Sequence, residues 1–204
     1  MARLDLKGLG IALITPFKQD GSVDFEALGR LLDYQLRNWS DYLVVLGTTG
    51  ETPTLTEDEK TEIKKFIVEK VNHKVPLILG CGGNCTASVI EQAKRVNPDE
   101  FDAILSVAPF YNKPSQEGLY QHYKAIAEAS PVPVVLYNVP GRTGVNIAAS
   151  TTLRLARDFE NIIAVKEASG NMSQIDEIIE NIIVILTFAF VIFWVDVTFK
   201  RCFW

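Results

Sequence analysis

The chain has 204 residues, 48% hydrophobic and 22% charged, which suits one globular domain with a sizeable core and excludes an intrinsically disordered protein. Its formal net charge is −5 and it has no run of Lys or Arg, so a nucleic-acid partner is not expected. Three cysteines and two histidines, with no secretory signal at the start, predict reduced thiols, no metal site and a cytoplasmic protein.

Short apolar runs alternate with amphipathic segments along the chain. Runs rich in Val, Ile and Leu, with little polar alternation, are typical of parallel strands buried on both faces. These runs cover residues 10–15, 42–46, 75–80, 103–107, 134–138 and 162–166. Helical patterns follow them, at residues 24–38, 56–71, 86–96, 116–129, 150–157 and 172–181. Each strand-to-strand step takes roughly thirty residues, the size of one βα unit.

Six βα units in succession fit either a doubly wound open sheet or a (β/α)₈ TIM barrel. No Gly-x-Gly-x-x-Gly follows the first strand, so a dinucleotide site is not expected. Polar, glycine-containing clusters follow three strands, at residues 47–51, 137–144 and 166–171. Barrel active sites are assembled from several such strand ends. The sequence therefore predicts an α/β fold of the TIM-barrel type, incomplete because only six of its eight units are recognisable.

The end of the chain differs in composition from the rest. We expect residues 1–181 to form a partial barrel that carries the catalytic groups, and residues 182–204 to form an atypical apolar tail. A truncated or frameshifted gene product is the favoured interpretation of the tail, and an irregular seventh strand is an alternative. A membrane segment is not favoured, because the uncharged run of residues 181–195 is shorter than the roughly 20 residues that span a bilayer.

The first polar cluster is Gly47-Thr48-Thr49-Gly50-Glu51. Glycines beside small hydroxyl residues can leave backbone N–H groups open to a carboxylate or a phosphate. A tight turn whose hydroxyl groups cap the next helix explains the same residues equally well.

The second cluster places Tyr137 at a strand end and Arg142 in the turn that follows. A guanidinium group can bind a carboxylate through two hydrogen bonds. A core tyrosine followed by a solvated arginine is the plainer interpretation of this cluster alone.

The third cluster begins with Lys166 at the end of the last apolar run. Ile162, Ala164 and Lys166 alternate along the strand and are expected on one face. If that face is apolar, desolvation lowers the pKa of the lysine and frees its amine to attack a ketone. A satisfied ion pair at the strand end is the alternative.

Together the three clusters supply an amine that can form an imine, a phenol, hydroxyl groups that can bind a carboxylate, and a guanidinium group that can bind a second carboxylate. With the segments 108–114 (Ala-Pro-Phe-Tyr-Asn-Lys-Pro) and 118–120 (Gly-Leu-Tyr), the sequence resembles the dihydrodipicolinate synthase family, within the larger N-acetylneuraminate lyase family, over about residues 4–180. The resemblance implies a lyase that condenses pyruvate with L-aspartate 4-semialdehyde to 4-hydroxy-tetrahydrodipicolinate, in lysine and diaminopimelate biosynthesis. Lys166 would hold pyruvate as a Schiff base, with no other cofactor.

The resemblance also implies roles for the residues around Lys166. Tyr137 would pass protons through Thr48 to Tyr111, which would reach in from a neighbouring subunit of a homotetramer built as a dimer of dimers. Thr48 and Thr49 would hold the carboxylate of pyruvate.

Two residues of the second cluster would act on the other substrate. Arg142 would attract the carboxylate of the semialdehyde and help to orient Tyr137. Gly141, which has no side chain, would leave room in the loop. Two alternatives stay open: another pyruvate aldolase, acting on N-acetylneuraminate or a keto sugar acid, and an inactive remnant. The Arg142 loop and the Thr48-Thr49 pair favour the synthase.

Some relatives are inhibited by lysine at a dimer interface, and this chain departs from the pattern expected there. Lys60 and Phe110 fit such a pocket poorly, because the positive charge of Lys60 would repel the ammonium group of the inhibitor. We expect weak or absent inhibition, and inhibition by lysine at physiological concentrations would contradict this. The matching positions are Thr52, Pro53, Glu57, Lys60, Asn84, Ser88 and Phe110.

Overall fold

The structure, a computed structural model, describes residues 4, 6–38 and 40–182. These residues belong to two compact units, which we call the N-terminal unit (residues 8–80) and the C-terminal unit (residues 81–182 with residues 4, 6 and 7). Of the tail expected over residues 182–204, only Ile182, the last residue of a helix, is among the described residues.

The N-terminal unit contains three parallel strands that pair in chain order. They are β1 (Gly10–Ala12), β2 (Tyr42–Val45) and β3 (Leu77–Gly80). All four residues of β2 are buried, as its continuous apolar sequence predicts. A Cβ atom at position 80 would overlap the carbonyl oxygen of Leu46, so the close approach of the two chains there requires glycine.

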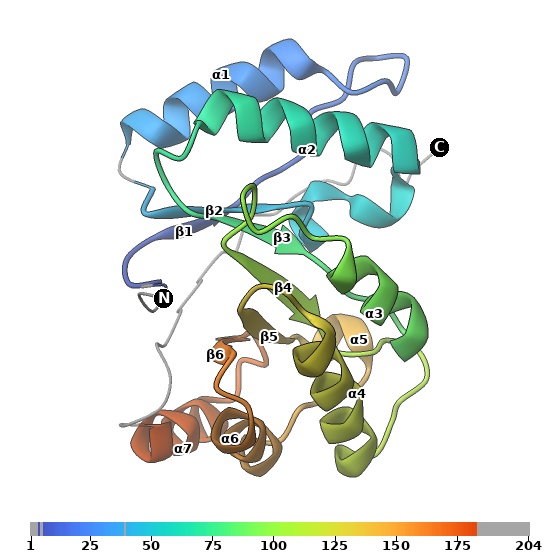
Figure 1. The fold of residues 1–204 in the computed structure, drawn as a ribbon, viewed down its shortest axis with the longest axis vertical. Helices are drawn as coiled ribbons and strands as arrows, with labels where there is room; N and C mark the ends of the chain where they lie inside the picture. The colour runs from blue at the N-terminus through green and yellow to red at the C-terminus, as the bar shows by residue number, and fades with distance from the viewer. Residues whose placement is uncertain (1–3, 5, 39, 183–204) are drawn as a thin grey trace. The chain divides into compact units, whose positions relative to one another are not determined.

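Two long helices of the N-terminal unit lie side by side, α1 (Phe25–Arg37) and α2 (Glu57–Val71) (Figure 1). The first is amphipathic and buries Leu28 and Leu32. The second begins with a capping box, in which the Thr56 hydroxyl accepts from the Glu59 N–H and the Glu59 carboxylate accepts from the Thr56 N–H. The sequence of the capping box therefore marks the start of α2.

The C-terminal unit contains the strands β4 (Ala103–Val107), β5 (Val134–Asn138) and β6 (Ile162–Glu167). β5 pairs with both of the others, and both pairings are parallel. The register between β5 and β6 shifts after Val134, so that Ile163 is an extra residue on β6. After this bulge the two strands run in step to their carboxyl ends. Ala164 and Lys166 therefore share a face as expected, but the expectation that Ile162 lies on the same face is wrong, because the extra residue shifts the alternation.

Five helices complete the C-terminal unit. Among them α3 packs on α4, α4 on α6, and α6 on α7, and Figure 1 shows α6 and α7 side by side. Their bounds are α3 (Thr86–Lys94), α4 (Gln116–Ala129), α5 (Pro140–Thr143), α6 (Ala149–Asp158) and α7 (Met172–Ile182).

The alternation of strands and helices expected from the sequence is confirmed, and the sequence missed only short elements. α5 and two 3-10 turns, η1 (Thr48–Gly50) and η2 (Thr52–Thr54), lie in segments expected to be loops. One turn of helix is too short to produce an apolar repeat of 3.6 residues, so hydrophobic periodicity does not detect it. All three follow strand ends, where the candidate residues also lie.

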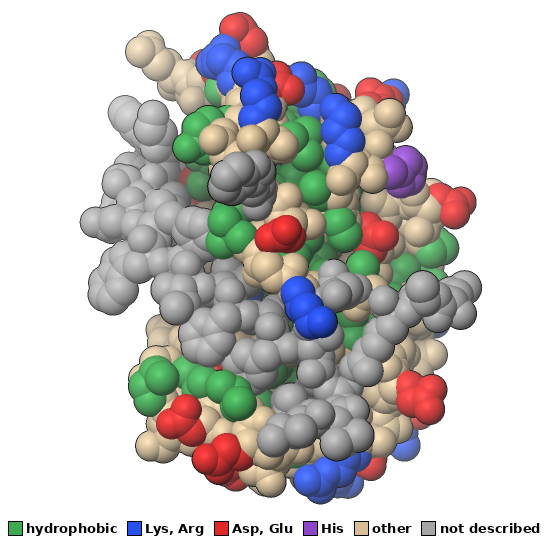
Figure 2. Space-filling model, turned by 90° about the vertical axis from the view of Figure 1, so that its left-hand side faces the viewer, with side chains coloured by type: hydrophobic (Ala, Val, Ile, Leu, Met, Phe, Trp, Pro, Cys, Tyr) green, Lys and Arg blue, Asp and Glu red, His purple; other side chains and the backbone are tan. Residues whose placement is uncertain are grey.

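Side chains of both charges are interspersed among the described residues on the face drawn in Figure 2. This mixture agrees with the totals of 20 Lys and Arg against 25 Asp and Glu. A concentrated basic face, which phosphate backbones require, is not seen on the described part of that face.

His122 of α4 is a buried histidine, 4% exposed, and we expect it to make stability depend on pH. Its Nδ1 lies 2.8 Å from the Thr86 hydroxyl, and its Nε2 has no hydrogen-bond partner within the described residues. Burial lowers the pKa of His122 to about 4, from 6.5. The folded state therefore binds fewer protons than the unfolded state between these values, and the free energy of unfolding decreases as pH falls from 6.5 to 4.

Between pH 7 and pH 5 the free energy of unfolding is expected to fall by about 2 kcal/mol, and urea unfolding at each pH measures this change. The variant His122→Gln cannot titrate and should show a correspondingly weaker dependence on pH. His73 is exposed, and His73→Gln is the matched control that should behave as the parent chain does. Equal pH dependence in the parent chain and in His122→Gln would contradict the prediction.

Candidate active site

The carboxyl ends of β5 and β6 bring Tyr137 and Lys166 together. Tyr137 is the cross-strand partner of Lys166, and Asn138 is the partner of Glu167. Cross-strand partners share a face of a sheet, and successive residues alternate between faces. Tyr137 and Lys166 therefore lie on one face of this strand pair, and Asn138 and Glu167 lie on the opposite face.

The amine of Lys166 is in an apolar and weakly solvated position. Its Nζ lies 4.5 Å from the centroid of the Tyr137 ring, and its strand neighbours Ala164 and Val165 are both 0% exposed. Burial, and next the positive charge of Arg142, lower the pKa of Lys166 to about 8 from 10.5. Both causes disfavour the ammonium form, so the lysine presents far more neutral amine near neutral pH than a solvated lysine does.

Arg142 lies in the short helix α5, directly after β5. Pro140 begins this helix, and Gly144, with a φ of +73°, ends it in the left-handed conformation. Arg142 is exposed, and its positive charge is the second cause, after burial, of the lowered pKa of Lys166. A one-turn helix directly after β5 thus carries the guanidinium group whose charge acts on Lys166.

Tyr111 belongs to the loop after β4 and is 86% exposed. Its backbone has a φ of +72°, which is rare for a residue with a side chain. The Tyr111 N–H donates to the carbonyl oxygen of Thr143 at 3.2 Å, so this loop is attached to the Arg142 turn. The phenol of Tyr111 itself points to solvent rather than being packed against its own chain.

Gly141 has open space around it. A Cβ atom at this position would meet no heavy atom within 4 Å, and its backbone is outside the left-handed region that favours glycine. Within the described residues, therefore, nothing in the chain itself requires glycine there.

Thr48 and Thr49 lie in the N-terminal unit, in the turn η1 after β2. Both side chains are partly exposed. The N–H groups of Gly50 and Glu51 donate to the carbonyl oxygens of Gly47 and Thr48, so part of the backbone of this cluster is used by the turn itself. The segment is a tight turn directly after β2, and Thr48 and Thr49 lie in its first two positions.

A buried polar network on the opposite face of β5 and β6 was missed by sequence reasoning. The carboxylate of Glu167, 9% exposed, accepts from Asn138 Nδ2 at 2.9 Å and 3.1 Å, from Gln174 Nε2 at 2.9 Å and from the Ser169 N–H at 2.8 Å. The available signal was a glutamate and an asparagine at the ends of two apolar strands, since buried polar groups are nearly always hydrogen-bonded.

The same network reaches the segment that follows the Arg142 turn. Asn138 Nδ2 donates to Asn146 Oδ1 at 2.7 Å, and the Ile147 N–H donates to Asn138 Oδ1 at 2.9 Å. Gln174 of α7 accepts from Asn146 Nδ2 at 2.8 Å and donates to the carbonyl oxygen of Ile147 at 3.2 Å. Asn138 therefore lies just before the loop in the chain and is also hydrogen-bonded to its far end, at Asn146 and Ile147.

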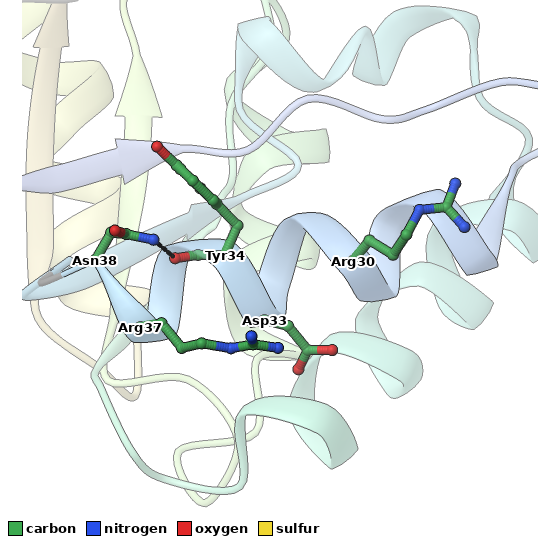
Figure 3. Close-up of a pocket in the computed structure, with 5 residues that line it drawn as sticks. All are labelled: Arg30, Asp33, Tyr34, Arg37 and Asn38. Atoms are coloured by element: carbon green, nitrogen blue, oxygen red, sulfur yellow. Dashed lines mark hydrogen bonds between the residues drawn. The ribbon is translucent and has the colours of Figure 1, made fainter.

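A shallow hollow of about 300 Å³ lies on α1 in the N-terminal unit, away from the candidate residues in the sequence (Figure 3). Asp33 at this hollow is paired with Lys70 at 2.9 Å, and Asn38 Nδ2 donates to the Tyr34 carbonyl oxygen at 2.7 Å. These contacts belong to the helix surface and its end, and they define no chemistry. The residues around the hollow are Arg30, Asp33, Tyr34, Arg37 and Asn38.

Two features of other classes of protein are absent from the described residues. No group of three or more His, Cys, Asp or Glu side chains is placed there to hold a metal ion. Nor does that part of the chain contain a helix long and apolar enough to cross a membrane.

Fold and site together define a class: an α/β protein of the TIM-barrel type with a partly buried lysine near the carboxyl end of a strand. The Dihydrodipicolinate synthetase family matches residues 5–188. The chain belongs to this family.

The chain is similar to named relatives over most of its length. It is 66% identical over 181 residues to the 4-hydroxy-tetrahydrodipicolinate synthase of Parabacteroides distasonis, and 64% identical to that of Phocaeicola vulgatus. In both comparisons 89% of this chain is covered, and the chain spans about 61% of the length of the relative.

A solved structure, dihydrodipicolinate synthase from Bacillus anthracis, is 46% identical, with a TM-score of 0.83 over 88% of this chain and 61% of that chain. The expected fold class, an incomplete (β/α)₈ barrel, is thereby confirmed.

Proposed function

We propose that the chain carries the lysine chemistry of a class I aldolase-type lyase, which condenses pyruvate with L-aspartate 4-semialdehyde to give 4-hydroxy-tetrahydrodipicolinate. The observation that carries this proposal is the amine of Lys166, whose pKa burial lowers to about 8, beside the ring of Tyr137. The substrates are inferred from relatives named 4-hydroxy-tetrahydrodipicolinate synthase. The product leads to diaminopimelate and lysine.

The proposed reaction balances without an oxidant or a reductant. Nζ of Lys166 attacks the ketone carbon of pyruvate, and water leaves as the imine forms. Loss of a proton from the methyl carbon gives an enamine, whose carbon forms a bond with the aldehyde carbon of the semialdehyde. The amino group of the semialdehyde then attacks the imine carbon, which closes the ring and releases Lys166. The lysine imine takes the place of a cofactor.

Proton transfer is assigned to hydroxyl groups by the family resemblance. Tyr137 would move protons to and from the reacting carbon atoms through Thr48 to Tyr111. Its burial, 7% exposed, and its cross-strand pairing with Lys166 support a role next to the imine. A phenol in such a position can serve as a general acid or base.

Two hydroxyl groups and one guanidinium group would hold the carboxylates of the two substrates. Thr48 and Thr49 would bind that of pyruvate, and Arg142 that of the semialdehyde, by charge-assisted hydrogen bonds. The exposure of the Arg142 side chain supports contact with an incoming substrate. Gly141, with open space around it, would leave room for that substrate.

We also propose that the working assembly is a homotetramer in the cytoplasm. An 86% exposed tyrosine in a strained backbone conformation supports a role for Tyr111 across a subunit contact. Cys81 and Cys85 are free thiols, in keeping with a reducing compartment. Light scattering coupled to gel filtration measures the assembly, and a monomer at micromolar concentration would contradict this part of the proposal.

Borohydride trapping tests the proposal directly. The chain is incubated with pyruvate, reduced with borohydride and digested, and mass spectrometry locates the adduct. We expect a pyruvate adduct on Lys166 and none on Lys94, a half-exposed lysine of α3 paired with Glu91. Addition of L-aspartate 4-semialdehyde should consume the imine, while N-acetylmannosamine, the aldehyde partner of N-acetylneuraminate, should not. An unmodified Lys166 would refute the proposal.

A further inference from the structure

The network around Glu167 lies directly behind the candidate active site. Asn138 and Glu167 each follow a candidate catalytic residue in the chain, Tyr137 and Lys166. The two pairs are in register across β5 and β6. Asn138 and Glu167 are therefore each one peptide unit away from Tyr137 and Lys166, and their side chains lie on the opposite face.

We propose that Glu167 is a positioning residue: its buried carboxylate, through Asn138 and Gln174, fixes the strand ends that carry Tyr137 and Lys166 and the loop that carries Arg142. The contribution of Glu167 to catalysis rests on the proposed function. Glu167 touches no reacting atom in this scheme and acts through its neighbours.

The donor and acceptor pattern of the network suits an ionised carboxylate and not an amide. Glu167 Oε1 accepts from the Ser169 N–H and Oε2 from Gln174 Nε2, while Asn138 Nδ2 donates toward both oxygens. A carboxylate accepts at both oxygens, whereas a glutamine has one acceptor and one donor. The substitution Glu167→Gln keeps the shape but sets one N–H₂ group against the donors of its neighbours. A donor facing a donor in a buried site is strongly unfavourable.

Asn138 carries the effect to the Arg142 loop. Its side chain holds both Asn146 and the N–H of Ile147, so it closes the segment between residues 139 and 147 that contains α5. The amide is fully used, with its oxygen on the loop and its nitrogen shared between the loop and Glu167. Loss of the carboxylate contact leaves this amide bonded to the loop but no longer to Glu167 of β6, so the loop is less firmly fixed to the strand that carries Lys166.

The experiment compares Glu167→Gln with the matched control Glu180→Gln, on an exposed position of α7. The rate of pyruvate trapping on Lys166 is measured against pH and divided by the folded fraction, obtained by circular dichroism and pulse proteolysis. We expect the rate per folded molecule to fall about 10- to 100-fold, the loss that follows misplacement of a reacting group by on the order of 1 Å. The pH midpoint should also rise above about 8, because a looser site admits water to Nζ.

A swap variant separates positioning from mere stability. Glu167→Gln combined with Gln174→Glu moves the carboxylate across the 2.9 Å contact and restores one donor–acceptor pair. We expect it to recover part of the trapping rate and to bring the pH midpoint back toward that of the parent chain. A structural role alone predicts lower stability with an unchanged rate per folded molecule and an unchanged midpoint in Glu167→Gln. That result would overturn the inference.

Formaldehyde distinguishes failure of this inference from failure of the proposed function. Reductive methylation, by formaldehyde with cyanoborohydride as the reductant, reports the neutral amine of Lys166 and needs no site for a carboxylate. If pyruvate gives no adduct in the parent chain, the proposed function fails, yet the methylation midpoint still measures the effect of Glu167. Equal midpoints in the parent chain and in Glu167→Gln would then reject the positioning role by itself.

Discussion

Replacing Lys166 by arginine is expected to abolish the pyruvate adduct and to lower turnover at least about 10³-fold, because the residue supplies the atom that forms the covalent bond. Arginine keeps the charge and much of the length, but its guanidinium stays protonated and cannot attack a ketone. Turnover is measured by NMR, as consumption of pyruvate and L-aspartate 4-semialdehyde, and the adduct by mass spectrometry.

The expected pH dependence of the parent chain follows from the lowered pKa of Lys166. With a pKa of about 8, the neutral amine increases as pH rises toward 8 and levels off above it. At pH 7.5 it is on the order of 10²-fold more abundant than in a lysine of ordinary pKa. Lys94→Arg, on the half-exposed lysine of α3, is the control and should leave both measurements unchanged. Full turnover in folded Lys166→Arg would disprove the assignment of the nucleophile.

Replacing Tyr137 by phenylalanine is expected to lower turnover by about 10²- to 10⁴-fold, the usual contribution of a general acid or base. The substitution removes only the phenol oxygen and keeps the ring 4.5 Å from Lys166 Nζ. The pH midpoint of pyruvate trapping should therefore stay near 8, because the burial and the Arg142 charge that set it are unchanged.

The contrast between rate and midpoint is what makes the Tyr137→Phe experiment decisive. A loss of turnover with an unchanged midpoint indicates a missing proton-transfer group, whereas a shifted midpoint indicates a disturbed lysine. Tyr34→Phe removes a phenol from a 62% exposed position on α1 and should change neither quantity. Turnover of Tyr137→Phe within about threefold of the parent chain would remove the phenol from the mechanism, since a general acid or base contributes far more.

The βα order was predictable because it depends on local patterns. Buried parallel strands read as short apolar runs, as in β2 and β5, and the start of α2 is marked by the capping box of Thr56 and Glu59. The bulge in β6 was not predictable, since an extra residue such as Ile163 leaves the apolar run unchanged. Strand ends could be located, and with them the clusters that hold the candidate residues.

The sequence by itself determined the βα repeat, the family resemblance and the strand-end positions of Tyr137 and Lys166, because each follows from residue type and spacing along the chain. Only the tertiary structure decided which side chains meet. The pairing of Tyr137 with Lys166, the lowered pKa of that lysine, and the carboxylate of Glu167 held by amides of β5 and α7 all depend on register and burial. Such contacts join residues far apart in sequence, and no local pattern encodes their distances or their exclusion of water.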